Sequence, residues 1–134
     1  MGKILIDKLA LIEIKDRRIL VSLNKGAKVW YTPGGQRENG ESNEQALIRE
    51  IKEELSVDIE PNTIKYFAWF EAPSHDRPDE LLVRITCYTA SYSGVLKPSA
   101  EIEKIDYFSY RQRFFVSTVD KSLFDDLKKR GFIE

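Results

Sequence analysis

The sequence predicts an α/β fold in which a mixed β-sheet lies between flanking helices. Two observations predict it. Short apolar and β-branched runs, typical of strands, occur along the whole chain, and two segments carry the four-residue apolar spacing of amphipathic helices. The 134 residues fit a single domain over positions 1–134, because no repeat or long linker divides them. A chain of this length buries roughly two thirds of its unfolded surface, which is enough for a core without disulfides.

Three strands are expected in the first third of the chain. Positions 9–14 and 19–23 are apolar runs, and the polar segment 15–17 between them has the composition of a turn. Positions 29–31 form a third, shorter run. We expect a type II turn at positions 33–35, because proline followed by glycine suits that geometry.

The clearest helix is predicted over positions 43–55. Ser42 is a suitable N-cap, and Gln45, three residues later, completes a capping box. Apolar residues recur every fourth position and form the expected buried stripe, which comprises Leu47, Ile51 and Leu55.

The second half of the chain is expected to supply further strands and a terminal helix. The strands are predicted at positions 64–71, 81–90 and 105–108. A polar loop at 72–79 joins the first two. The helix is predicted over 119–130, where Gly131 follows its last residue and suits the left-handed position after a helix.

Composition and charge exclude several classes of protein. The chain has 21 Lys plus Arg against 22 Asp plus Glu, so a dedicated nucleic-acid binder is disfavoured. No apolar run approaches the roughly 20 residues of a membrane helix, and Asp7 interrupts the only candidate for a secretory signal. The single cysteine, Cys87, excludes an internal disulfide and multi-cysteine zinc sites. We therefore expect a cytoplasmic protein without a membrane or nucleic-acid partner.

Three carboxylates are predicted to share one face of the helix at 43–55. Glu50, Glu53 and Glu54 are spaced i, i+3 and i+4, so they repel one another unless a cation lies between them. Mg²⁺ prefers such oxygen ligands. A solvated acidic face is the simpler alternative. The glycine turn before the helix, together with Glu41 and with Arg49 four residues before Glu53, favours the cation.

This segment resembles the sequence box of the Nudix hydrolase family, G-x5-E-x7-R-E-U-x-E-E-x-G-U, in which U is a bulky aliphatic residue. The matching residues, within positions 35–57, are Gly35, Glu41, Arg49, Glu50, Ile51, Glu53, Glu54 and Val57. Ser56 stands where the family has glycine, so modest backbone strain is expected after the helix. The resemblance implies the Nudix fold, an α/β/α sandwich around a mixed sheet.

The resemblance also implies hydrolysis of a nucleoside diphosphate linked to another moiety, with Mg²⁺ or Mn²⁺ as cofactor. It makes Glu53 and Glu54 the main metal ligands, and Glu50 a further ligand or the base that activates water. The carbonyl of Gly35 would complete the metal site. Arg49 and Glu41 would hold the ligands in place.

Residues outside the box are weaker candidates. Family members often use one more acid from a loop before a late strand. Glu101 is the first candidate for this acid and Glu103 is the second. The alternative is that these are solvated loop acids without a catalytic role. The general base therefore stays open between Glu50 and these two. Tyr31 and Lys25 are candidates for contact with the substrate base and phosphates. His75, in the polar loop, fits a surface role better than catalysis.

The chain resembles compact MutT-like members of the family, so the leading substrate is a nucleoside triphosphate, cleaved to a monophosphate and pyrophosphate. ADP-ribose or another nucleoside diphosphate sugar is the alternative, indicated by Pro73, which lies 16 residues beyond the box. A nucleotide-binding module without turnover is the alternative of another class. The intact glutamates disfavour it.

Overall fold

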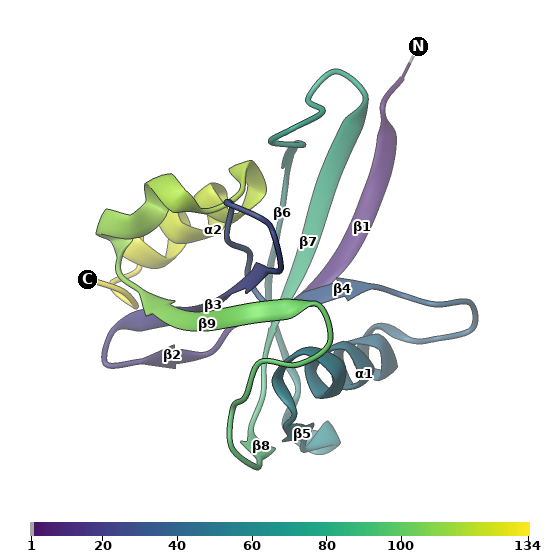
Figure 1. The fold of residues 1–134 in the computed structure, drawn as a ribbon, viewed down its shortest axis with the longest axis vertical. Helices are drawn as coiled ribbons and strands as arrows, with labels where there is room; N and C mark the ends of the chain where they lie inside the picture. The colour runs from purple at the N-terminus through teal and green to yellow at the C-terminus, as the bar shows by residue number, and fades with distance from the viewer. Residues whose placement is uncertain (1) are drawn as a thin grey trace.

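The computed structural model describes residues 2–134 (Figure 1). The strands are β1 (Ile4–Leu11), β2 (Ile14–Lys15), β3 (Arg18–Asn24), β4 (Gly34–Gln36), β5 (Asp58–Ile59), β6 (Lys65–Pro73), β7 (Leu81–Thr89), β8 (Tyr92–Ser93) and β9 (Ile102–Phe108). The α-helices are α1 (Asn43–Leu55) and α2 (Thr118–Lys129), and short 3₁₀ turns cover Pro61–Thr63 and Tyr110–Phe115. No helix within residues 2–134 is both long and apolar enough to cross a membrane.

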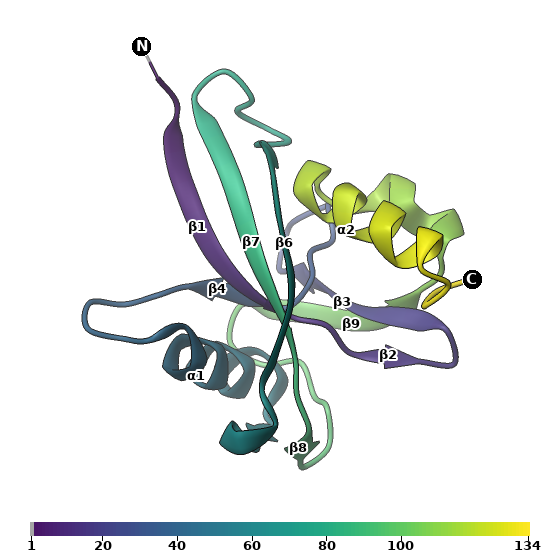
Figure 2. The same ribbon diagram turned by 180° about the vertical axis from the view of Figure 1, so that it is seen from behind.

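A mixed sheet in the order β4-β1-β7-β6 forms the centre of the molecule, which confirms the predicted fold class. β1 pairs with β7 in parallel along its whole length, from Ile4 opposite Leu81 to Leu11 opposite Tyr88. β4 and β6 complete this sheet as antiparallel neighbours. A second sheet has the order β2-β3-β9. Helix α1 packs against β1 and β4, whereas α2 packs against β6 and β7, so the helices lie on different sides of the strands (Figure 2).

The predictions for the first third of the chain were partly wrong. β1 covers residues 4–11 rather than 9–14, and positions 29–31 form two isolated bridges instead of a strand. The expected turn at 33–35 is also wrong, because Gly34 and Gly35 belong to β4. A Cβ atom on Gly34 would lie 1.9 Å from the carbonyl oxygen of Leu9. Glycine is needed there for the close approach of two strands, not for a turn.

Helix α1 begins and ends where the sequence predicts. Its capping box is formed. The backbone amide of Gln45 donates to Ser42 Oγ at 3.1 Å, and the backbone amide of Ser42 donates to Gln45 Oε1 at 2.9 Å. The apolar stripe is completely buried against residues of β1 and β3, a cluster that contains Leu9, Leu11, Leu20, Leu47, Ile51 and Leu55. Packing of this stripe fixes the orientation of α1, and so the direction of the acidic residues beside the stripe.

The later elements are confirmed with shifted ends. The strand predicted at 105–108 begins at Ile102, and the last helix begins at Thr118, one residue early, with Ser117 as its N-cap. Ser56 adopts a φ of 64°, the left-handed conformation expected after α1. Cys87 is buried in the core beneath α2, and burial raises the pKa of its thiol. The core location makes it a small apolar side chain rather than a nucleophile.

Candidate active site

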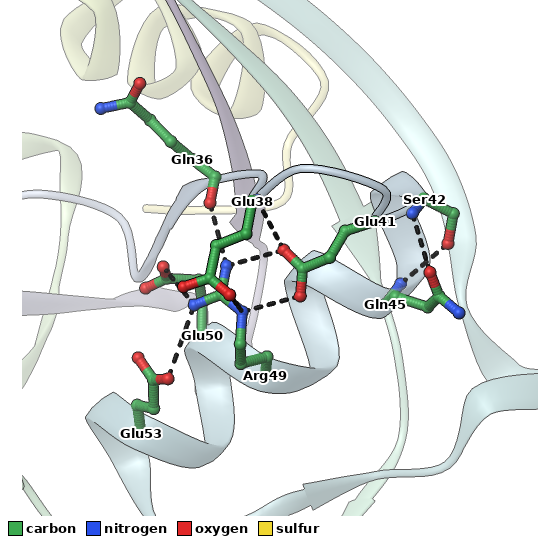
Figure 3. A network of polar contacts seen from close by, with 8 residues as sticks. All are labelled: Gln36, Glu38, Glu41, Ser42, Gln45, Arg49, Glu50 and Glu53. Atoms are coloured by element: carbon green, nitrogen blue, oxygen red, sulfur yellow. Dashed lines mark hydrogen bonds and ion pairs between the residues drawn. The ribbon is translucent and has the colours of Figure 1, made fainter.

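Arg49 is the centre of a polar network that joins α1 to the loop before it (Figure 3). Its Nε and Nη2 atoms donate to the two carboxylate oxygens of Glu41 at 2.7 and 2.9 Å, a bidentate pair. Nη2 also donates to the carbonyl oxygen of Gln36 at 3.0 Å. This hydrogen bonding lowers the pKa of Glu41 to about 2 and raises the pKa of Arg49. The loop is therefore fixed to the helix by charge-assisted hydrogen bonds.

The same guanidinium reaches two of the three predicted ligands. Arg49 Nη1 lies 2.9 Å from Glu50 Oε1 and 3.5 Å from Glu53 Oε1. The Glu50 side chain is 17% exposed and that of Glu53 is 52% exposed. Burial raises the pKa of Glu50, and the hydrogen bond from Arg49 opposes this shift. Arg49 thus offsets part of the repulsion between these carboxylates.

Glu54 has a different environment from the other two acids. Its Oε1 atom accepts a hydrogen bond from the backbone amide of Gly34 at 3.0 Å. Burial raises the pKa of Glu54 to about 8, despite the opposing effects of that hydrogen bond and the Lys8 ammonium. The hydrogen bond to Gly34 places this carboxylate against β4.

Gly35 lies directly against Glu50. A Cβ atom at this position would be 2.5 Å from Glu50 Cδ, closer than any side chain tolerates. Glycine thus allows the backbone of β4 to approach the Glu50 carboxylate.

The residues of α1 fit a hard divalent cation by their chemistry. Carboxylate oxygens on neighbouring turns, next to a backbone carbonyl, are the ligands such a cation prefers. Within residues 2–134, however, no three His, Cys, Asp or Glu side chains are arranged so that they could hold a metal ion together. Arg49 engages Glu50 and Glu53, and the amide of Gly34 engages Glu54. The predicted carboxylate ligands lie on the same helix, but they are not arranged around a common metal position.

The loop at residues 97–101 is attached to the end of α1. The backbone amides of Lys97 and Ser99 donate to the carbonyls of Leu55 and Glu54 at 2.9 and 3.0 Å. The Ser99 hydroxyl also donates to the carbonyl of Glu53. Glu101, two residues further on, is exposed, and so is Glu103. The loop, although not the Glu101 side chain, is thus fixed to the turn that carries Glu53 and Glu54.

A cavity of about 250 Å³ opens beside the acidic helix. Glu54 and Gly34 line one part of its wall, Lys8 and Thr32 line another, and His75 and Asp120 complete it. The lining residues come from β1, β3, the segment before β4, β4 itself, α1, the end of β6 and the loop after it, β7, and the start of α2. Lys25 and Glu101 do not line it. Lys25 is exposed, and its backbone amide donates to the Glu101 carbonyl at 2.9 Å.

Asp120 is a buried acid in this cavity that the sequence did not single out. It accepts hydrogen bonds from the hydroxyls of Thr32 and Ser117 at 2.5 and 2.6 Å. Burial raises its pKa, which the two hydroxyl groups and the Lys8 ammonium oppose. An acid in the first turn of a helix usually stabilises the end of that helix. The sequence therefore indicated a local role for Asp120 and not its place in a cavity.

Tyr31 and His75 meet at the cavity, although 44 positions separate them. The Tyr31 hydroxyl lies 3.2 Å from His75 Nε2, and Lys8 Nζ lies 5.0 Å from the centre of the Tyr31 ring. Tyr31 therefore lines the cavity next to Lys8 and His75, and its contact with substrate stays a prediction. His75 is exposed, as predicted, but it also belongs to the cavity wall.

Comparison with known proteins identifies a family. The NUDIX domain family matches residues 9–126. The 8-oxo-dGTP diphosphatase of Proteus vulgaris is 40% identical over 50 residues, which cover 37% of this chain and 40% of that protein. The RNA pyrophosphohydrolase of a Nitratiruptor species is 30% identical over 122 residues, 77% of this chain and 76% of that protein. The match thus spans less than half of the first relative and about three quarters of the second.

Solved structures agree in fold. A nudix hydrolase family member from Chromobacterium violaceum superposes with a TM-score of 0.71 at 25% identity, over 96% of this chain and 80% of that one. The range matched by the family contains α1, the glycine loop before it, and the cavity residues Tyr31, His75 and Asp120.

Proposed function

The chain belongs to the Nudix hydrolase family, and on that premise we propose that it hydrolyses a nucleoside triphosphate to a nucleoside monophosphate and pyrophosphate. Nudix hydrolases generally use divalent metal ions, and the proposed cofactor is Mg²⁺ or Mn²⁺. The 8-oxo-dGTP diphosphatase among the relatives supports a nucleoside triphosphate as substrate.

The position of Glu54 is the observation that supports this proposal most. Its carboxylate belongs to the acidic face of α1 and also lines the cavity of about 250 Å³. A molecule in that cavity therefore has one end next to the proposed metal site. A nucleotide would fit this arrangement with its nucleoside in the cavity and its phosphates at the proposed metal site on α1.

Each acidic residue has a proposed role. Glu50, Glu53, Glu54 and the carbonyl of Gly35 would hold the cation. When bound, the cation supplies charge neutralisation of the phosphates and a lower pKa of water. Arg49 and Glu41 are positioning residues, because their bidentate pair fixes the loop after β4 to α1, and Arg49 also donates to the carbonyl of Gln36, the residue that follows Gly35. Glu50 is either a further ligand or the base for water, and Glu101 and then Glu103 are the alternative bases.

The test is a hydrolysis panel with Mg²⁺ or Mn²⁺. It compares ordinary and oxidised nucleoside triphosphates, ADP-ribose, a dinucleoside polyphosphate and a 5′-triphosphorylated RNA oligonucleotide. We expect a nucleoside triphosphate to give the highest kcat/KM, with monophosphate and pyrophosphate as products. Preference for ADP-ribose would support the alternative enzyme, and preference for the RNA would contradict the expected absence of a nucleic-acid substrate. No turnover of any compound would favour a binding module.

A further inference from the structure

Two side chains from distant segments of the chain meet in the lining of the cavity. Tyr31 precedes β4, and His75 lies in the loop of residues 74–80 between β6 and β7. Their contact joins Tyr31 Oη to His75 Nε2 at 3.2 Å, and the two rings meet edge to face with centroids 5.7 Å apart. This hydrogen bond links a loop to the otherwise separate wall that carries Tyr31.

Both partners are held in place on their own sides. Tyr31 is fixed through its backbone, since its amide donates to the Ser22 carbonyl at 2.9 Å. The residue before His75, Ser74, is buried; its amide donates to the Leu81 carbonyl at 2.9 Å, and its hydroxyl donates to Asp76 at 2.6 Å. His75 therefore extends from an anchored point of the loop, and its ring position is defined by Tyr31.

The environment favours a neutral tyrosine in this bridge. Burial, with the nearby charges of Asp76 and Asp120, raises the pKa of Tyr31. The hydroxyl thus keeps its proton and can donate it to the imidazole nitrogen. The Lys8 ammonium lies over the ring, so the aromatic wall also carries a positive charge beside it.

We propose that His75 is a positioning residue for substrate binding: through its hydrogen bond to the Tyr31 hydroxyl, it holds the aromatic wall of the cavity in the orientation that receives the nucleoside part of the substrate. The inference rests on the proposed function for the identity of that ligand. Glu54 lines the same cavity as His75, but His75 is not among the residues proposed to hold the cation or to activate water.

A double-mutant cycle tests this role with the best substrate from the panel. Tyr31→Phe removes only the hydroxyl, and His75→Ala removes its partner. We expect each variant to raise KM about 3- to 10-fold with kcat within about twofold of wild type, the range of one net hydrogen bond. The double variant should be no worse than either single variant. His75→Gln, whose amide reaches the position of Nε2, should restore KM to within about twofold.

The matched control is Asp79→Ala, an exposed residue of the same loop that does not line the cavity. It should leave both kinetic constants unchanged. An unchanged KM in His75→Ala, or additive effects in the double variant, would overturn the proposal, provided that thermal unfolding shows the variants folded.

A second measurement works without turnover, because His75 is the only histidine in the chain. In tag-free protein, its imidazole proton resonances are unambiguous in an NMR spectrum. We expect Tyr31→Phe to shift them in the free protein, and a nucleoside monophosphate to shift them in wild type. If no nucleotide is hydrolysed, the proposed function fails while the first shift still tests the bridge. If Tyr31→Phe leaves the resonances unmoved, the bridge fails while hydrolysis stands.

Discussion

Glu53 and Glu54 are neighbours in the sequence, yet the fold gives them different environments. Glu53 is half exposed and lies 3.5 Å from the Arg49 guanidinium, whereas Glu54 is directed into the cavity wall with its pKa raised to about 8. Successive helical residues point about 100° apart, so one side chain of the pair turns to solvent and the other to the strands. A cation held by both would have one solvent-facing and one protein-facing ligand.

Replacing Glu53 by Gln is expected to lower kcat at least 100-fold while leaving the melting temperature within about 2 °C of wild type. The proposed metal site loses a charged ligand, but no buried contact is removed from this half-exposed side chain. Steady-state kinetics and thermal unfolding measure the two effects. Glu44→Gln, an exposed acid in the first turn of the same helix, is the matched control. Full activity of Glu53→Gln would contradict the metal assignment.

Asp120 predicts a dependence of stability on pH. Burial raises its pKa above the ordinary value of 3.8, so the native state holds this proton more tightly than the unfolded state does. Ionisation therefore costs stability as the pH rises above 3.8, and the cost is absent below it. Asp120→Asn, which cannot ionise, should be more stable than wild type at pH 7, and the difference should shrink as the pH falls toward 4.

Urea unfolding between pH 4 and pH 8 measures this difference for Asp120→Asn. Asp79→Asn, at an exposed position, should show no such trend. A difference between Asp120→Asn and wild type that stays constant with pH would mean that lost hydrogen bonds, rather than the charge, determine its sign.

At the scale of elements, local signals predicted α1 better than any strand. Its N-cap, its capping box and its apolar period all lie within the helix and its flanking residue, so the sequence contains the whole explanation. The sequence did not predict β4, because its glycines are needed only where the strand lies close to β1. Gly34 faces Leu9, which lies 25 residues earlier in the chain. Strand pairing of this kind depends on tertiary contact rather than on local preference.

The same distinction applies to the candidate site. The box residues are adjacent on one helix and one loop, so their shared face follows from spacing alone. The cavity residues Lys8, Tyr31, His75 and Asp120 come from four separate segments. Each has an ordinary local explanation, as a strand, loop or helix-cap residue, and only the fold brings them together. The single-domain assignment and the individual roles of the site residues stay predictions.

The turn after α1 offers a test at this scale. Ser56 holds a left-handed φ of 64°, and its hydroxyl donates to the Lys97 carbonyl at 3.2 Å. Ser56→Gly should relieve strain and raise stability by up to about 1 kcal/mol, a few degrees in melting temperature. Ser56→Ala keeps the strain and loses the hydrogen bond, so it should be less stable than wild type. If Ser56→Gly is less stable than wild type, the hydroxyl contact outweighs the strain.

For the whole molecule, the near-neutral total hides a strong segregation of charge. Positions 38–60 hold 8 acids and 2 bases, a net charge of −6, while the remainder carries +5. Six of these acids lie on α1 or in the loop before it, and Asp58 and Glu60 follow the helix. The basic remainder favours the approach of an anionic substrate, and a bound cation would remove the repulsion at the acidic segment itself.

Mg²⁺ or Mn²⁺ should therefore stabilise the native state. A cation at 100 times its Kd adds about 2.7 kcal/mol, which corresponds to roughly 10 °C in melting temperature for a chain of this size. Thermal unfolding with and without the metal, at matched ionic strength, measures the shift. The double variant Glu53→Gln/Glu54→Gln should lose it, and chelation should reverse it in wild type. An equal shift in the double variant would place the cation elsewhere.

The parallel pairing of β1 with β7 also has a consequence for how the molecule is made. In the sequence, the glycine loop and α1 lie between these two strands, because β1 ends at Leu11 and β7 begins at Leu81. During synthesis, the acidic helix therefore leaves the ribosome well before the strand that completes its supporting sheet. Such long-range pairing slows folding, so we expect the residues of α1 to be synthesised before the site around them can be completed. Catalytic competence is then acquired late, in the step that docks β7 beside β1.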